Sequence, residues 1–349
     1  DLEIKEDIAE EIGRLYGYDK LKLTLPERSS KPVSKNVLLE FKKQIRNLML
    51  RVGANETVTY SFVNSSLIES VDQNQELAYK LSNALSPDIQ YYRLSLAPSL
   101  LEKVHSNIKS GSPKFVLYEM SKVIEKTYKD PNESDLPKEL YRLAIVITDN
   151  SKTLSAYYQA KNYLDYLMVE LGLEYKIISL EDKDVDVEFT QTAKAFEPIR
   201  SGSVYVGNVF IGIIGEPKQS VKKLLKLPNY TSMIELDLTK LSEIARERPY
   251  VQLSNYPKID QDICFKVPTA VKYIDLHNMA KKLIGEYSKD AQLTLSPIDI
   301  FQGKETKYKQ ITLRLILNSY TKTLKNSDLV DLMDALKSRV ATDFAGDII

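Results

Sequence analysis

The sequence has 349 residues, of which 43% are hydrophobic and 28% are charged, so it can form two or three domains with a sizeable core. Its 48 basic and 48 acidic residues give a net charge of +0, so no overall field indicates a nucleic-acid or membrane partner. The single cysteine, Cys264, excludes a disulfide framework and a cysteine-based metal site. With no signal peptide and no membrane-spanning apolar run, we expect a cytoplasmic protein with no membrane partner. The start on Asp1 leads us to expect a piece of a longer chain.

The opening stretch, DLEIKEDIAEEIGRLYGYDKL, predicts an amphipathic helix. Its apolar residues recur at helical spacing, namely Ile8, Ile12, Leu15 and Tyr16. Asp7, Glu10 and Glu11 are three or four positions apart and share another face. Carboxylates on one face can hold a hard cation such as Mg2+. They are also typical of a solvated first turn that complements the helix dipole.

The next part of the chain predicts a linker and then helices and strands. The linker is the proline- and serine-containing stretch 23–36. A helix follows it and ends at Gly53. The stretch TVTYSFV, residues 57–63, is β-branched and aromatic and predicts a strand, and another is expected near 78–81. A helix containing Leu100, Leu101, Val104 and Ile108 follows.

The middle of the sequence predicts a mostly antiparallel sheet with helices, an α+β plan. Strands are predicted at 115–124, 141–148 and 232–238. The stretch 141–148 is continuously apolar, so both of its faces should be covered. An amphipathic helix is expected at 157–171, and a hairpin at 203–216 whose strands meet at Gly207 and Asn208.

After about residue 250 the pattern becomes strand, helix, two strands, helix and a short strand. This βαββαβ order over about a hundred residues is typical of the ferredoxin-like unit. Such a sheet can bind RNA by stacking bases on aromatic side chains, and it can equally be an interaction module.

The sequence contains none of the common catalytic motifs. There is no GxxxxGK[ST] phosphate loop, no GxSxG elbow and no HExxH. Arg93 lies between a predicted strand and a predicted helix, where it could clamp a carboxylate or phosphate or form a structural ion pair.

Six stretches, in order, resemble the β subunit of bacterial phenylalanyl-tRNA synthetase. The opening stretch resembles the family's segment before the core, and LSNALSPDIQYYRLSLAPSLLEKVHSN, VLYEMSKV and GIIGEP resemble parts of the core. NYPKIDQDICFKV and PIDIFQG resemble its ferredoxin-fold anticodon-binding domain. The resemblance implies an antiparallel-sheet class II synthetase-like core followed by a ferredoxin-like domain. It divides the chain into the end of a magnesium-linked domain with a linker (1–35), the non-catalytic core (36–247) and the anticodon-binding domain (248–349).

The resemblance also implies a function. The chain would be a non-catalytic, tRNA-binding and scaffold subunit of an α2β2 tetramer, inactive by itself. The α subunit would bind ATP and phenylalanine and attach phenylalanine to tRNA(Phe). Two alternatives stay open: a stand-alone class II-like ATP-dependent ligase, and a protein-interaction scaffold without RNA binding.

The family's functional residues correspond to two sets in this sequence. Asp1, Asp7, Glu10 and Glu11 match carboxylates that bind magnesium shared with the α subunit. The anticodon-reading aspartate and tyrosine match Asp299 and Phe301, and a lysine–serine pair matches Lys309 and Gln310.

The strand positions of the residues matched to anticodon reading predict which of their side chains share a face. Asp299 and Phe301 are two residues apart on one strand and should share a face, and Gln310 can join them if the register is right. Three lysines, Lys304, Lys307 and Lys309, would surround the face and meet phosphates. Phe301 lacks the tyrosine hydroxyl, and Gln261 and Ile349 also depart from the family pattern. The alternative is that Phe301 is a buried core residue.

Overall fold

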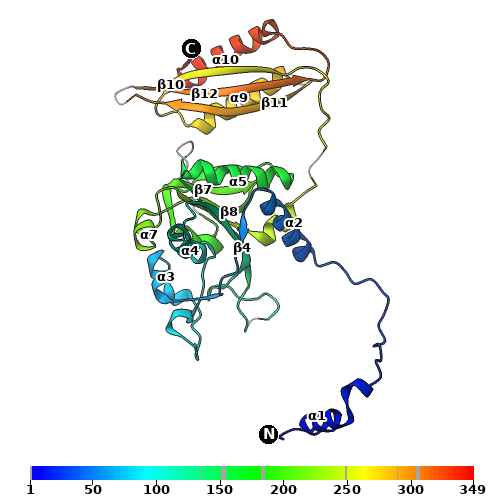
Figure 1. Ribbon diagram of the computed structural model, residues 1–349. Helices are drawn as coiled ribbons and strands as arrows, with labels where there is room; N and C mark the ends of the chain where they lie inside the picture. The colour runs from blue at the N-terminus through cyan, green and yellow to red at the C-terminus, as the bar shows by residue number, and fades with distance from the viewer. Residues whose placement is uncertain are drawn as a thin grey trace. The chain divides into compact units, whose positions relative to one another are not determined.

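The computed structural model describes residues 2–133, 135–150, 155–181, 185–247, 250–288, 290–303 and 307–349. Its contacts divide the chain into two compact units, Asp1–Pro249 and Tyr250–Ile349, and Figure 1 shows the elements of each. Within these ranges, no helix combines the length and the apolar character needed to span a bilayer.

The first helix, α1 (Lys5–Tyr16), forms where the sequence predicts it. The Asp7 carboxylate accepts the backbone N–H groups of Glu3 and Ile4 at 2.8 and 3.0 Å and so caps the start of the helix. The helix ends at Gly17, whose φ of 98° is accessible to glycine. The turn η1 (Tyr18–Lys20) follows, and residues 21–36 have no regular structure. The apolar face of α1 is exposed, at 54% for Ile8 and 80% for Leu15.

A seven-stranded sheet organises the rest of the first unit, in the order β1-β4-β5-β9-β8-β7-β6. Only the β1–β4 pair is parallel among its neighbouring strands. Its strands are β1 (Asn55–Glu56), β4 (Lys114–Val123), β5 (Leu140–Asp149), β6 (Lys176–Ser179), β7 (Phe196–Val206), β8 (Val209–Pro217) and β9 (Thr231–Asp237). The predicted turn at Gly207 and Asn208 joins β7 to β8, and Gly207 has the positive φ that such a turn requires.

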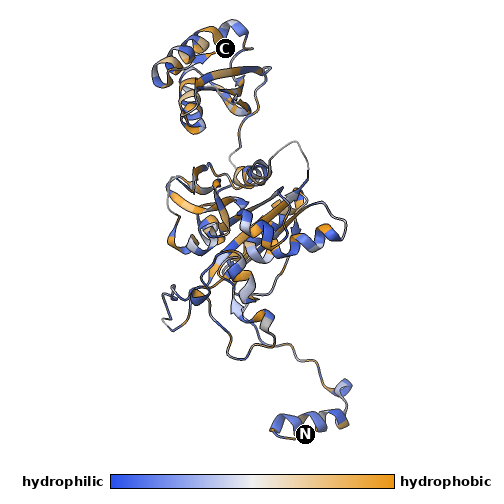
Figure 2. Cartoon of the chain, turned by 90° about the vertical axis from the view of Figure 1, so that its left-hand side faces the viewer, coloured by the Kyte–Doolittle hydropathy of each residue, from blue (hydrophilic) through white to orange (hydrophobic). Residues whose placement is uncertain are grey.

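Helices cover both faces of this sheet, as the alternating side chains of β5 show. Ile145 and Ile147 pack with α2 (Val37–Arg51), α5 (Ala156–Glu170) and α8 (Leu238–Ile244). Ala144 and Val146 pack on the opposite face with α4 (Ala97–Lys109), η4 (Val187–Phe189) and α7 (Gln219–Leu224), next to the short α6 (Thr190–Ala193). Figure 2 shows the hydrophobic colour concentrated in these central strands. The prediction that this stretch is covered on both faces is therefore confirmed.

The region before α4 differs from the sequence prediction. The stretch 57–63 is not one strand, because only Phe62–Val63 is extended and paired, as β2 with β3 (Tyr91–Tyr92). The preceding residues turn toward β4, where the Thr57 N–H donates to the Tyr118 carbonyl and the Thr59 hydroxyl donates to Glu119. The strand expected near 78–81 is only an isolated bridge between Lys80 and Tyr91. The short elements α3 (Ser65–Ser70), η2 (Gln75–Leu77) and η3 (Pro87–Ile89) complete this region.

The second unit has the βαββαβ order that the sequence predicts. Its elements are β10 (Ile259–Pro268), α9 (Tyr273–Tyr287), β11 (Ala291–Phe301), β12 (Tyr308–Ser319), η5 (Asn326–Leu329), α10 (Val330–Phe344) and β13 (Asp347–Ile348). The antiparallel sheet has the order β11-β12-β10-β13. Alternate residues of β10 and β12 are buried in one core with both helices, so the opposite face of the sheet is open. The α+β fold class with a ferredoxin-like second unit is confirmed.

Candidate functional site

Two of the predicted magnesium ligands on α1, Asp7 and Glu11, are engaged in local contacts. Backbone N–H groups bind Asp7 and lower the pKa of its carboxyl. Glu11 forms an ion pair with Arg14, and Glu10 is exposed. Asp1 lies outside the described residues, and those residues contain no group of three or more acidic, histidine or cysteine side chains placed to hold a metal ion. Magnesium would have to displace these local partners, so the magnesium site stays a prediction.

The open face of the second sheet brings three of the predicted residues together. A bulge shifts the β11–β12 register between Pro297 and Asp299, and after it Asp299 pairs with Thr312 and Phe301 with Gln310. Directly paired residues on neighbouring strands share a face. Because the neighbouring Ile311 of β12 is fully buried toward the helices, Asp299, Phe301 and Gln310 lie on the open face.

The exposure of this face settles one alternative left by the sequence. Phe301 is 60% exposed, so it is not a core residue of the unit. Asp299 is also exposed, and Gln310 is half-buried between its neighbours.

The predicted lysines are placed differently from one another. Lys307 is exposed just before β12, and Lys304 lies outside the described residues. Lys309 pairs with the buried Val267 and therefore points to the helix side, where its Nζ donates to the Thr269 carbonyl at 2.9 Å. The structure does not bring Lys309 to the open face.

The structure adds two residues that the sequence reasoning missed. Lys266 of β10 pairs with Gln310 and so lies on the open face, and Tyr308 is two residues before Gln310 on the same face. The Lys266 Nζ lies 5.5 Å from the centroid of the Tyr308 ring. The alternation in QDICFKV is the signal that could have placed Lys266 opposite the apolar residues, but only the register shows which residue of β12 lies beside it.

A charged pair also lies on this face. The Arg314 Nε and Nη2 donate to the two oxygens of Asp262 at 2.7 and 2.8 Å, a fork-like pairing. This contact lowers the pKa of Asp262 and raises the pKa of Arg314. The pair is about half exposed, so both groups are also accessible to solvent or to a ligand.

In the first unit, Arg93 is part of a buried network. Its Nη2 lies 3.0 Å from Glu119 Oε1, and both side chains are at most 3% exposed. Its Nη1 donates to the Thr59 hydroxyl at 2.7 Å, and Thr59 in turn donates to Glu119. Arg93 therefore forms a structural ion pair and is not open to a ligand.

Further buried charges lie on the α4 face of the same sheet. Arg142 contacts Asp237 at 3.1 Å, and its guanidinium lies 4.0 Å from the centroid of the Phe189 ring. Glu235 accepts the backbone N–H groups of Leu96 and Ala97, the latter at 2.7 Å, where α4 begins. Burial raises the pKa of Glu235, and these N–H groups oppose that rise.

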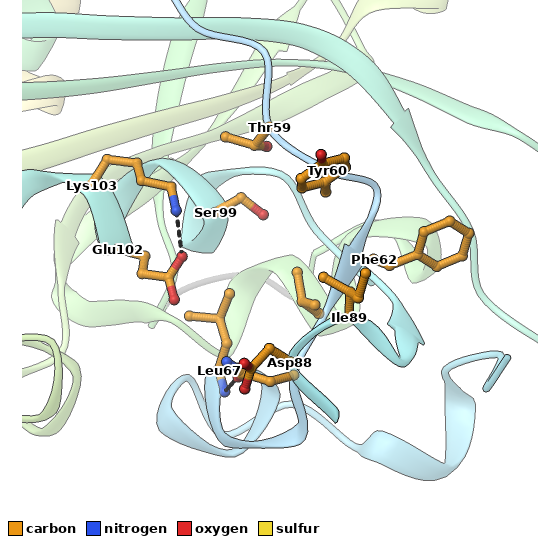
Figure 3. Close-up of a pocket in the computed structure, with 11 residues that line it drawn as sticks. Thr59, Tyr60, Phe62, Leu67, Asp88, Ile89, Ser99, Glu102 and Lys103 are labelled. Atoms are coloured by element: carbon orange, nitrogen blue, oxygen red, sulfur yellow. Dashed lines mark hydrogen bonds and ion pairs between the residues drawn. The ribbon is translucent and has the colours of Figure 1, made fainter. Parts of the chain in front are cut away.

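A cavity of about 300 Å³ lies elsewhere in the first unit, between residues 59–67, η3 and α4. Figure 3 shows Tyr60, Leu67, Ile89 and Ser99 around it, with the Lys103 ammonium turned toward Glu102 at 2.8 Å. None of the residues predicted from the sequence lines this cavity. The sequence indicated no ligand for its lining residues, although several of them lie in the stretch LSNALSPDIQYYRLSLAPSLLEKVHSN.

Comparison with protein families matches both units. A model described as "Phenylalanyl tRNA synthetase beta chain CLM domain" matches residues 21–238, and one described as "Ferredoxin-fold anticodon binding domain" matches residues 254–348.

Curated relatives carry the name phenylalanine–tRNA ligase beta subunit. One such protein of Bacillus cereus is 25% identical over 361 residues, which cover 100% of this chain and 43% of the relative. That of Clostridium acetobutylicum is 25% identical over 336 residues, which cover 94% of this chain and 40% of the relative. The chain thus spans about two fifths of the length of these relatives. Among solved structures, pyrrolysyl-tRNA synthetase from Desulfitobacterium hafniense matches at 11% identity and a TM-score of 0.46, over 60% of this chain and 71% of that chain.

Proposed function

Because the chain belongs to the phenylalanyl-tRNA synthetase beta chain family, we propose that it is the tRNA-binding and scaffold part of a cytoplasmic phenylalanine–tRNA ligase. In this proposal an α subunit activates phenylalanine with ATP and transfers it to tRNA(Phe). The chain pairs with that subunit in an α2β2 assembly and supplies no catalytic residue.

The observation that carries the proposal is the exposed face shared by Asp299, Phe301 and Gln310. The Phe301 ring offers a surface on which an unpaired base can stack. The Asp299 carboxylate accepts hydrogen bonds from a base edge, and the Gln310 amide can both donate and accept. Lys307 is exposed just before β12 and adds positive charge near this end of the sheet. Together these groups suit the unpaired bases of an anticodon loop.

The buried charges of the first unit support the scaffold role. A site that binds ATP needs cationic groups open to phosphates. In the first unit, Arg93 is paired with Glu119 and Arg142 with Asp237, and all four side chains are at most 5% exposed. These charges hold the strands to one another, which favours a structural core over the stand-alone ligase alternative.

Binding of a tRNA(Phe) transcript to the full chain tests the proposal. We expect Phe301→Ala to weaken binding by about 1–3 kcal/mol, the typical loss for one stacking ring. Because the ring is 60% exposed, the free energy of unfolding should change by less than about 0.5 kcal/mol. The matched control is Tyr287→Ala, which removes a ring of 54% exposure from the end of α9 on the helix side of the unit.

Two results would count against the proposal. One is equal binding by wild type and Phe301→Ala, and the other is equal affinity for tRNA(Phe) and for the same transcript with a replaced anticodon. The assembly is tested separately, by mixing the chain with the α subunit of a related bacterial enzyme and measuring the mass of the complex.

A further inference from the structure

We propose that Tyr308 and Lys266 form a second RNA-binding position beside Phe301, where the next unpaired base stacks on the Tyr308 ring and its phosphate meets the Lys266 ammonium. This inference rests on the proposed function and extends it to residues that were not assigned there.

The strand register places the two positions side by side. Phe301 ends β11 and pairs with Gln310, and Tyr308 begins β12 two residues earlier. Two residues along a strand correspond to about 6.6–6.8 Å, and diagonal neighbours across a pair of strands are about 7–8 Å apart. The Phe301 and Tyr308 side chains therefore start from neighbouring points of one face.

The Tyr308 ring lies beside Lys266 and is accessible. Lys266 of β10 brings its Nζ to 5.5 Å from the ring centroid. Tyr308 remains 45% exposed, and Lys266 is exposed as well. A ring with a cation over it suits a nucleotide, because a flat base can stack on the ring and the cation can meet the negative phosphate.

Tyr308 can act in the same way as Phe301. Each of the two rings offers a flat surface on which one unpaired base can stack. With Lys309 bound to the Thr269 carbonyl on the other face, Lys266 is the cation that the register places next to Gln310. The alternative is that Tyr308 and Lys266 only close the end of the β10–β12 ladder, where Tyr308 pairs with Pro268.

The test uses the full chain and two RNA probes, the tRNA(Phe) transcript and a hairpin of its anticodon arm. We expect Tyr308→Ala to weaken binding of both by roughly 10-fold or more, as for the loss of one stacking ring. Tyr308→Phe keeps the ring and should stay within about threefold of wild type. Tyr320→Ala is the matched control, because Tyr320 is 38% exposed and lies just past the other end of β12.

The charge of Lys266 is tested by the salt dependence of binding. Lys266→Met should reduce the slope of log affinity against log salt by about one phosphate contact. Lys282→Met removes the same charge from an exposed position of α9 and should leave the slope unchanged.

The outcomes separate this inference from the proposed function. If Phe301→Ala weakens binding and Tyr308→Ala does not, the second position is wrong and the proposed function stands. If Tyr308→Ala weakens binding and Phe301→Ala does not, the second position is supported and the Phe301 platform is wrong. If wild type binds neither probe, both are wrong. If Tyr308→Ala lowers the thermal midpoint, the binding measurement is made with Tyr308→Leu instead, because leucine keeps apolar contacts without a ring. An affinity of Tyr308→Leu equal to that of wild type would overturn the inference.

Discussion

Arg93 and Glu119 form an ion pair at 3.0 Å in which neither side chain is more than 3% exposed. Removal of one partner from such a pair leaves the other charge buried and unpaired, which typically costs about 3–5 kcal/mol. We therefore expect Glu119→Ala to lower the free energy of unfolding by about that amount, as measured by urea denaturation. Glu102→Ala is the control, because the Lys103–Glu102 pair is more than 40% exposed and should contribute at most about 1 kcal/mol.

A double variant tests whether the cost comes from the unpaired charge. Arg93→Met combined with Glu119→Leu should recover much of the stability lost in Glu119→Ala, because no buried charge remains. Equal losses in the single and double variants would instead assign the cost to packing.

The chain alone should not activate amino acids. Arg93 and Arg142 are paired with internal carboxylates, so neither is available to hold the phosphates of ATP. We expect no phenylalanine-dependent ATP/pyrophosphate exchange from the purified chain, with an added α subunit as the positive control. Exchange activity that stays with the chain through successive purification steps would favour the stand-alone ligase.

Acid should weaken the second unit through Asp262. Arg314 lowers the pKa of Asp262 below its ordinary 3.8, so the pair stabilises the fold above about pH 4, and this contribution is lost as the pH falls through the lowered pKa. The urea midpoint of wild type should therefore fall more between about pH 5 and about pH 3 than that of Asp262→Asn. Arg314→Met should reduce the pH dependence in the same way, and an unchanged dependence in both variants would contradict the assignment.

Magnesium binding at α1 can be measured in the full chain through backbone amide signals. An ion held by Glu10 and Glu11 has to compete with Arg14, so we expect a saturable shift that includes Arg14 and is absent from the variant with both Glu10→Gln and Glu11→Gln. A non-saturating response that is equal in both proteins would identify the acidic face as a solvated helix surface.

The sequence predicted the regular elements best where the side-chain pattern alone decides the structure. The apolar run at 141–148 and the turn at Gly207 and Asn208 gave β5 and the β7–β8 hairpin correctly. The strand predicted at 57–63 was only partly right: Phe62–Val63 forms β2, whereas Thr57 and Thr59 hydrogen-bond to the Tyr118 carbonyl and the Glu119 carboxylate of β4. Such partners are distant in the sequence and leave no local signal.

For the candidate RNA-binding face too, the sequence predicted what depends on one strand and missed what depends on contacts between strands. Alternation along β11 was sufficient to place Asp299 and Phe301 on one face, although the bulge between Pro297 and Asp299 was not foreseen. Lys309 was expected beside them, but it points to the helix side. Lys266 was missed because it comes from another strand, and only the register brings it to Gln310.

The stretch without regular structure between α1 and α2 sets a distance limit. Its sixteen residues, 21–36, can span at most about 53–58 Å when fully extended. If a partner binds α1 and the sheet of the first unit with two sites that lie within this distance, binding to one brings the other to an effective concentration in the millimolar range. A longer linker should lower this effective concentration only gradually, roughly as the −3/2 power of linker length. Cleavage of the linker should remove the gain in affinity from simultaneous binding at both sites.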